Sequence, residues 1–200
     1  SGPGSQSVLD RWNGTSYWWN QMIAQAGYIV VCVDGRGTGG RGEEFKKMTY
    51  LQLGHYETID QIETAKYMGT LPYVDKARIG IFGWSYGGYS TLMAMTRFAG
   101  SYDAGVALVG MSNLTSFLLN TAPYRRVLRI SEYGDPEKDK EALKKLSPIT
   151  YVDQIKSPLM IIQGANDPRV PVGEAIQMHE LMQKKGINSQ LIIFANEGHG

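Results

Sequence analysis

The stretch Gly83-Trp84-Ser85-Tyr86-Gly87-Gly88 limits the folds open to this sequence more than any other. It follows a compact apolar run, 78–82, that predicts a buried strand, and it precedes residues 89–95, which predict a helix. A strand, a G-x-S-x-G turn and a helix form a nucleophile elbow, in which strained backbone lifts the serine hydroxyl out of the sheet. Glycines two residues away on either side avoid collisions. The alternative is a glycine-rich turn in another kind of α/β protein.

Strands and helices are predicted to alternate along the chain. The predicted strands are continuous apolar runs, which are typical of a parallel sheet covered by helices on both faces. These strands are Tyr28–Val33, Arg78–Phe82, Ala104–Val109, Pro158–Gln163 and Gln190–Ala195. The predicted helices are Ser16–Ala26, Glu57–Tyr67, Tyr89–Met95, Pro136–Leu146 and Val172–Lys185, and 114–130 is helical in parts.

Composition narrows the class of protein further. The 200 residues suit one domain, and a net charge of +1 gives no reason to expect nucleic acid or an anionic membrane as a partner. The single cysteine, Cys32, excludes an internal disulfide, and its apolar neighbours predict a buried, inert thiol. The glycine-dense loop 34–42 lacks the G-K-[ST] ending of a phosphate-binding loop. Neither a cofactor nor a metal site is indicated.

A nucleophilic serine needs a base and an acid that orients the base. In the α/β-hydrolase fold these follow in the order serine, acid, histidine. Asp167 follows the predicted strand 158–163, and His199 follows the last predicted strand. Functional groups gather at the carboxyl ends of strands in open α/β sheets. The sequence therefore predicts a triad of Ser85, Asp167 and His199.

Other readings of these positions stay open. Asp167 precedes Pro168 and could be a turn residue. Glu197 could be a charged, solvent-exposed residue of a loop. The other two histidines are His55, just before a predicted helix, and His179, inside one. Both are expected to be surface or packing residues.

Long motifs around these residues resemble the prolyl oligopeptidase family of serine peptidases over nearly all 200 residues. Two branches of the family are mixed. The segments similar to bacterial dipeptidyl peptidase IV are 2–6, Asp34-Gly35-Arg36-Gly37-Thr38-Gly39, 53–54 with 60–63, and the elbow 83–89. Those similar to the acylaminoacyl-peptidase type are 110–114, 133–136, Gln163-Gly164-Ala165-Asn166-Asp167-Pro168-Arg169-Val170-Pro171 and 197–200.

The resemblance implies a role for each matching residue. Ser85 would be the nucleophile, Asp167 the orienting acid, His199 the general base, and the Tyr86 amide one oxyanion donor. The pocket for the residue before the scissile bond would be lined by Trp84, Tyr86, Met111, Leu114, Phe117 and Val170. The proline-specific branch has paired tyrosines in this region, where this chain has Leu114, Phe117 and Thr121. Core packing is the alternative for Met111 and Leu114.

The leading hypothesis is a serine peptidase that cleaves short peptides through an acyl-enzyme. An apolar lining predicts a Pro-like or Ala-like residue before the scissile bond and rejection of Lys and Asp, because an unpaired buried ion is costly. A carboxylesterase with the same triad and a catalytically inert hydrolase-fold domain are the alternatives. A homodimer is compatible with the resemblance. A bacterial periplasm or cytoplasm is the expected compartment.

The resemblance also implies parts that residues 1–200 do not contain. The family places a β-propeller before this α/β-hydrolase domain, and a strand of the fold lies between the strands predicted at 28–33 and 78–82. We therefore expect an incomplete sheet at the N-terminal side, low stability and little activity for the 200 residues alone. Direct pairing of 28–33 with 78–82 would contradict this expectation.

Overall fold

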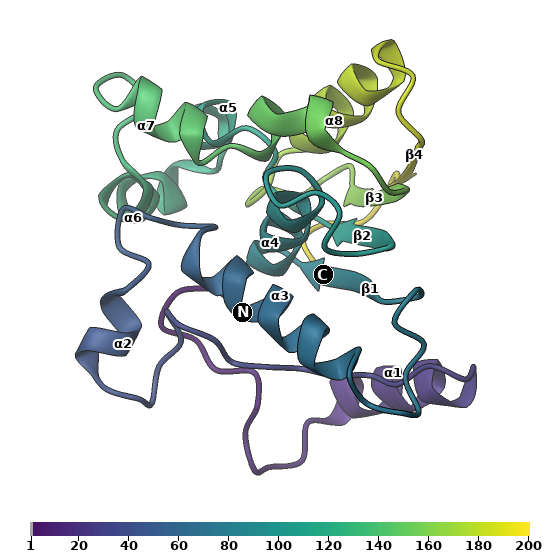
Figure 1. Cartoon of the computed structure of the whole chain (residues 1–200). Helices are drawn as coiled ribbons and strands as arrows, with labels where there is room; N and C mark the ends of the chain where they lie inside the picture. Colours follow the sequence, from purple (N-terminus) through teal and green to yellow (C-terminus); the bar gives the residue numbers. More distant parts are fainter. Residues whose placement is uncertain (1) are drawn as a thin grey trace.

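The computed structural model describes residues 2–200, and its centre is a parallel four-stranded sheet (Figure 1). The strands follow one another across the sheet in chain order, and each pairs in parallel with the next. They are β1 (Gly80–Trp84), β2 (Ala104–Leu108), β3 (Leu159–Gly164) and β4 (Ser189–Phe194). Each parallel connection contains at least one helix, as such crossovers require.

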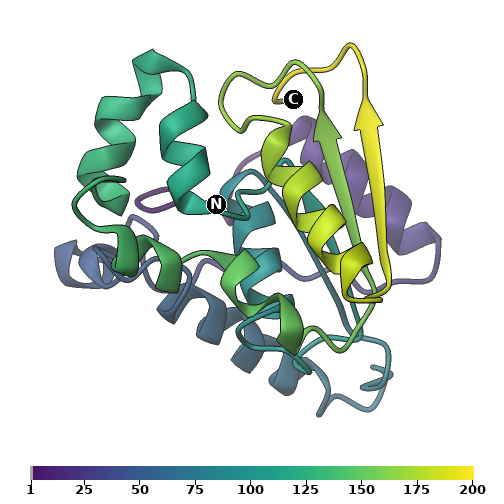
Figure 2. The same cartoon turned by 90° about the horizontal axis from the view of Figure 1, so that it is seen from above.

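The helices cover the two faces of this sheet unequally. On one face α4 (Tyr86–Met95) packs on β1 and β2, and α8 (Gly173–Lys184) packs on β3 and β4. Outside α4 lies α3 (Tyr56–Met68). The purple helix α1 (Gly14–Gln25) lies on the opposite side from α8 (Figure 2). There the Trp19 and Phe82 rings are 6.2 Å apart, and Phe82 stays half-exposed.

The segment predicted as a strand at 28–33 is the main departure from the expected sheet. Among the described residues it forms no strand and has no backbone hydrogen bond to 78–82, so the direct pairing does not occur. Tyr28, Ile29 and Val31 are exposed. Cys32 is also exposed, so the predicted buried thiol is wrong. Apolar and β-branched residues favour a strand at 28–33, but a strand forms only where a neighbouring strand completes its backbone hydrogen bonds.

The segment 114–130, predicted to be helical in parts, contains one short helix and most of a second, which runs on to residue 133. They are α5 (Leu114–Asn120) and α6 (Pro123–Tyr133). The Asn113 side chain accepts hydrogen bonds from the first turn of α5. Pro123 keeps Ala122 extended and starts α6 with a fixed backbone angle. The short helices α2 (Glu43–Lys47) and α7 (Lys140–Lys145) and the 3-10 turn η1 (Pro148–Gln154) complete the fold.

Two apolar clusters hold these layers together. One lies between the sheet and α3, α4 and α8, and it includes Leu92, Ile161 and Met178. The other joins α4 to α5–α7 and includes Tyr89 and Phe117. The second cluster fixes the position of α5 and α6 beside the elbow. None of the described helices has the length and apolar character needed to cross a bilayer.

Candidate active site

The elbow joins β1 to α4 through strained backbone. Ser85 has φ 60° and ψ −115°, and its amide donates to the Leu108 carbonyl at 2.9 Å. A Cβ on Gly83 would lie 2.2 Å from the Gly87 carbonyl oxygen, so this glycine is required. Gly87 itself has open space, whereas a Cβ on Gly88 would lie 2.5 Å from the Leu108 carbonyl. The second indispensable glycine is therefore Gly88, not the expected Gly87.

The loops after β3 and β4 carry the predicted acid and base. Asp167 follows β3 and His199 follows β4, so both lie at the carboxyl edge of the sheet beside the elbow. A Cβ at Gly164, the last residue of β3, would lie 2.2 Å from the Gly198 carbonyl. The absence of a side chain at Gly164 thus allows the His199 loop to approach β3.

A chain of hydrogen bonds links the three predicted residues. His199 Nε2 is 2.8 Å from Ser85 Oγ, and His199 Nδ1 is 2.7 Å from Asp167 Oδ2. The Asp167 side chain is fully buried, and its Oδ1 accepts from the Arg169 amide at 2.8 Å and the Val170 amide at 3.0 Å. Burial by itself raises the pKa of Asp167, but these hydrogen bonds outweigh it and the net pKa shift is downward. Asp167 is thus held as a carboxylate.

The other two histidines, and the loop residue Glu197, do not take part in this chain of hydrogen bonds. The His55 ring packs against Tyr56 and Phe98, and His179 Nδ1 lies 2.9 Å from the Ser189 hydroxyl. Glu197 is exposed, as expected of a loop charge. The structure therefore brings one histidine, His199, to Ser85.

Tyr86 connects the elbow to a half-buried carboxyl on α3. Its hydroxyl donates to Glu57 Oε1 at 2.5 Å, and the Gly54 amide donates to the same oxygen at 2.6 Å. Glu57 Oε2 is buried without a partner among the described residues. Burial raises the pKa of Glu57, against the lowering influence of the two hydrogen bonds. Since Tyr86 follows Ser85, the predicted nucleophile, this contact fixes the backbone at the predicted oxyanion amide.

We expect Glu57→Gln to become more stable relative to wild type as the pH rises. A carboxyl with a raised pKa binds its proton more tightly in the folded state, so its contribution to stability is lost as the pH rises from the unfolded pKa, about 4.3, through the folded value. Glutamine keeps the acceptor oxygen and does not titrate. Denaturant unfolding at pH 5 and pH 8 measures the difference. An unchanged difference between wild type and variant at the two pH values would contradict the assignment.

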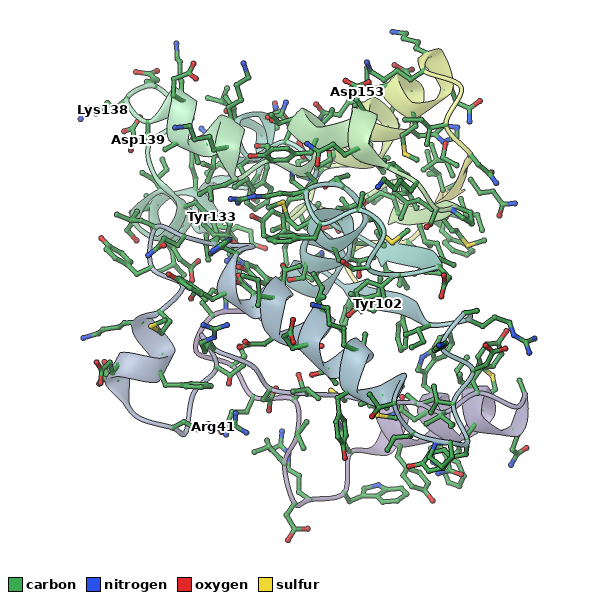
Figure 3. The ribbon with its side chains drawn as sticks, viewed as in Figure 1. Arg41, Tyr102, Tyr133, Lys138, Asp139 and Asp153 are labelled. Carbon is green, nitrogen blue, oxygen red and sulfur yellow. The ribbon has the colours of Figure 1, made fainter. Side chains whose placement is uncertain are left out.

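A cavity of about 60 Å³ opens beside Ser85 and His199. Its apolar wall contains four of the predicted pocket residues: Tyr86, Met111, Phe117 and Val170. Thr121 also lines it. Tyr133, labelled in Figure 3, comes from the end of α6 and reaches the cavity between that helix and α4.

Two predicted pocket residues lie elsewhere. Leu114 is fully buried in the cluster below α5 and does not line this cavity, so its alternative, core packing, describes it better. Trp84 is exposed and lines a second cavity of about 350 Å³ on another side of Ser85. Its Nε1 donates to the His199 carbonyl at 3.0 Å, so Trp84 supports the histidine loop instead.

Three arginines in the cavity wall were absent from the sequence prediction. They are Arg125 and Arg129 of α6, and Arg169 of the loop that carries Asp167. Arg125, Arg129 and Tyr133 are four residues apart, which places them along one side of a helix. This spacing could have indicated that the three side chains share one side of a helix. The sequence prediction for 114–130 did not define α6 as a separate helix, so the spacing was not used.

Comparisons with known proteins agree over most of the chain. Residues 14–200 match the model of the family described as "Prolyl oligopeptidase family". The chain is 38% identical to dipeptidyl aminopeptidase BIII of Pseudoxanthomonas mexicana over 190 residues, which cover 91% of this chain and 27% of that protein.

Solved structures give the same result. The crystal structure of Porphyromonas gingivalis dipeptidyl peptidase 4 superposes with a TM-score of 0.86 and 39% identity, covering 100% of this chain and 27% of that one. Pyrococcus horikoshii acylaminoacyl peptidase gives 0.83 and 28%, covering 90% and 29%. The chain thus spans about a quarter of the length of these relatives. With its parallel sheet, its elbow and this family match, the chain belongs to the prolyl oligopeptidase family.

Proposed function

We propose that this chain forms the catalytic α/β-hydrolase domain of a serine peptidase that cleaves short peptides through an acyl-enzyme. The observation that carries the proposal is the continuous hydrogen-bond chain from Ser85 through His199 to Asp167. The names of the relatives, dipeptidyl aminopeptidase and acylaminoacyl peptidase, support a peptide substrate. The preceding propeller and the homodimer remain predictions.

Each residue has a role in the proposed reaction. Ser85 Oγ attacks the peptide carbonyl carbon while His199 Nε2 takes the hydroxyl proton, and the carbonyl oxygen becomes an oxyanion near the Tyr86 amide. When the C–N bond breaks, His199 returns the proton to the leaving amine and an ester on Ser85 remains. Water, deprotonated by His199, then hydrolyses that ester and restores the serine. Asp167 accepts from Nδ1–H and stabilises the imidazolium.

The apolar wall supports an apolar or proline-like residue before the scissile bond. Met111, Phe117 and Val170 are buried and offer no charge or hydroxyl. A lysine there would lose its hydration without gaining a carboxylate partner.

We expect 4-nitroanilides with Ala or Pro before the scissile bond to be cleaved with kcat/KM on the order of 10²-fold above the Lys analogue. A fluorophosphonate probe should label Ser85 in the same preparation. Short-chain nitrophenyl esters distinguish an esterase, which would cleave them and none of the anilides. Absence of labelling would instead favour an inert domain. Efficient cleavage after Lys would refute the apolar pocket.

A further inference from the structure

We infer that the cavity beside Ser85 is a carboxylate-binding subsite, which admits an Asp or Glu side chain before the scissile bond. This inference rests on the proposed function and extends it to acidic substrates. Its basis is the charge of the cavity wall, where Arg125, Arg129 and Arg169 lie beside the apolar residues.

Two of these guanidinium groups have no anionic partner. Among the described residues, neither Arg125 nor Arg169 forms a salt bridge, and Arg125 Nε is buried without a hydrogen-bond acceptor. Arg129 pairs with Glu132 at 3.0 Å. The wall thus has more positive than negative charge, and a buried donor without an acceptor is unfavourable unless a ligand supplies one.

The orientation of α6 is unusual, because it turns arginines toward the cavity and apolar side chains toward solvent. A surface helix normally turns its apolar side toward the protein and its charged side toward water. In α6, Arg125 and Arg129 line the cavity, whereas Val127 is 80% exposed and Leu128 58% exposed. Two like charges four residues apart also disfavour the helix. An anion between them would offset that repulsion.

The third arginine is held in place by the proposed triad. The Arg169 amide donates to Asp167 Oδ1, and the Thr121 hydroxyl donates to the Arg169 carbonyl at 2.8 Å. These two contacts fix the backbone of Arg169 at the cavity beside His199. A guanidinium presents several donors in a planar fork that matches a carboxylate.

The arginines change the expected selectivity in one direction. Rejection of both Lys and Asp was expected from an apolar lining alone. With guanidinium groups in the wall, a carboxylate entering the cavity finds a charged partner and an ammonium finds like charge. The methylene groups of a Glu side chain would still contact Met111 and Phe117. We therefore still expect the cavity to reject a Lys side chain, but we expect it to accept an Asp or Glu side chain.

Four 4-nitroanilides that differ only in the residue before the scissile bond, Ala, Gln, Glu and Lys, test the inference. Gln is the neutral isostere of Glu, so the Glu/Gln ratio of kcat/KM isolates the charge. We expect a ratio of about ten or more at low salt, because hydrogen bonds to charged groups are about twice as strong as neutral ones. The ratio should fall as salt is added.

Arginine variants locate the effect. Arg125→Gln should lower the Glu/Gln ratio about tenfold, while Arg125→Lys, which keeps the charge, should retain a ratio above one. Arg129→Gln should also lower it. Arg78→Ala is the matched control, since Arg78 is exposed and pairs with Asp75 away from the cavity. Thermal unfolding of every variant separates loss of folding from loss of preference.

The outcomes distinguish this inference from the proposed function. Cleavage after Ala with a wild-type Glu/Gln ratio of one or less overturns the subsite and leaves the peptidase intact. A high ratio that survives both Arg125→Gln and Arg129→Gln also overturns it. Failure of the full-length protein, with its predicted propeller, to cleave any of the four substrates overturns the proposed function and the subsite together.

Discussion

Ser85→Ala is expected to abolish peptide hydrolysis, and His199→Ala is expected to reduce kcat by on the order of 10⁴-fold or more. The first variant removes the attacking oxygen. The second removes the one group among the described residues that is placed to take its proton, the Nε2 atom at 2.8 Å. Steady-state kinetics with the Ala anilide measure both losses. A fluorophosphonate probe should fail to label either variant at the wild-type rate, because labelling needs the same activated hydroxyl.

The other two histidines provide matched controls for His199. His179→Ala removes a contact to Ser189, and His55→Ala removes ring packing against Tyr56 and Phe98. Both should change stability more than kcat. Equal loss of kcat in a well-folded His55 or His179 variant would show that the base has been misassigned.

The elbow and the positions of Ser85, Asp167 and His199 can be predicted because each signal lies in a short stretch of sequence, while their catalytic roles stay predictions. A glycine-flanked serine between an apolar strand and a helix is compatible with few local structures. The loops after two later strands bring an acid and a histidine to the same edge of the sheet. Asp167 and His199 lie where strand order places them. The choice among three histidines was possible because two of them lie outside strand ends.

The cavity was harder to predict because its lining comes from separate helices. Residue type alone could not tell Leu114, buried beneath α5, from Phe117, which reaches the cavity three residues later. The arginines of α6 were missed because a charged helical side normally faces water. The segment 28–33 has the composition of a strand, but pairing depends on a neighbour that composition does not reveal.

Asp167→Asn is expected to lower kcat by on the order of 10⁴-fold with little change in fold. The asparagine oxygen can still accept from the Arg169 and Val170 amides. Its NH₂ group then faces His199 Nδ1, where the carboxylate accepted a hydrogen bond at 2.7 Å. The imidazole must turn its lone pair toward Asn and place its proton on Nε2, so it can no longer deprotonate Ser85. Kinetics at neutral pH measure the loss.

Stability against pH gives this variant a second readout. The net pKa of Asp167 is lowered in the folded protein, so its contribution to stability is present above the unfolded pKa, about 3.9, and is lost as the pH falls through the folded value. Asp167→Asn should remove that acid-side dependence. Asp10→Asn is the control, because Asp10 is exposed and forms no salt bridge among the described residues. If Asp167→Asn kept wild-type kcat, the proposal that the Asp167 carboxylate orients His199 for catalysis would be wrong.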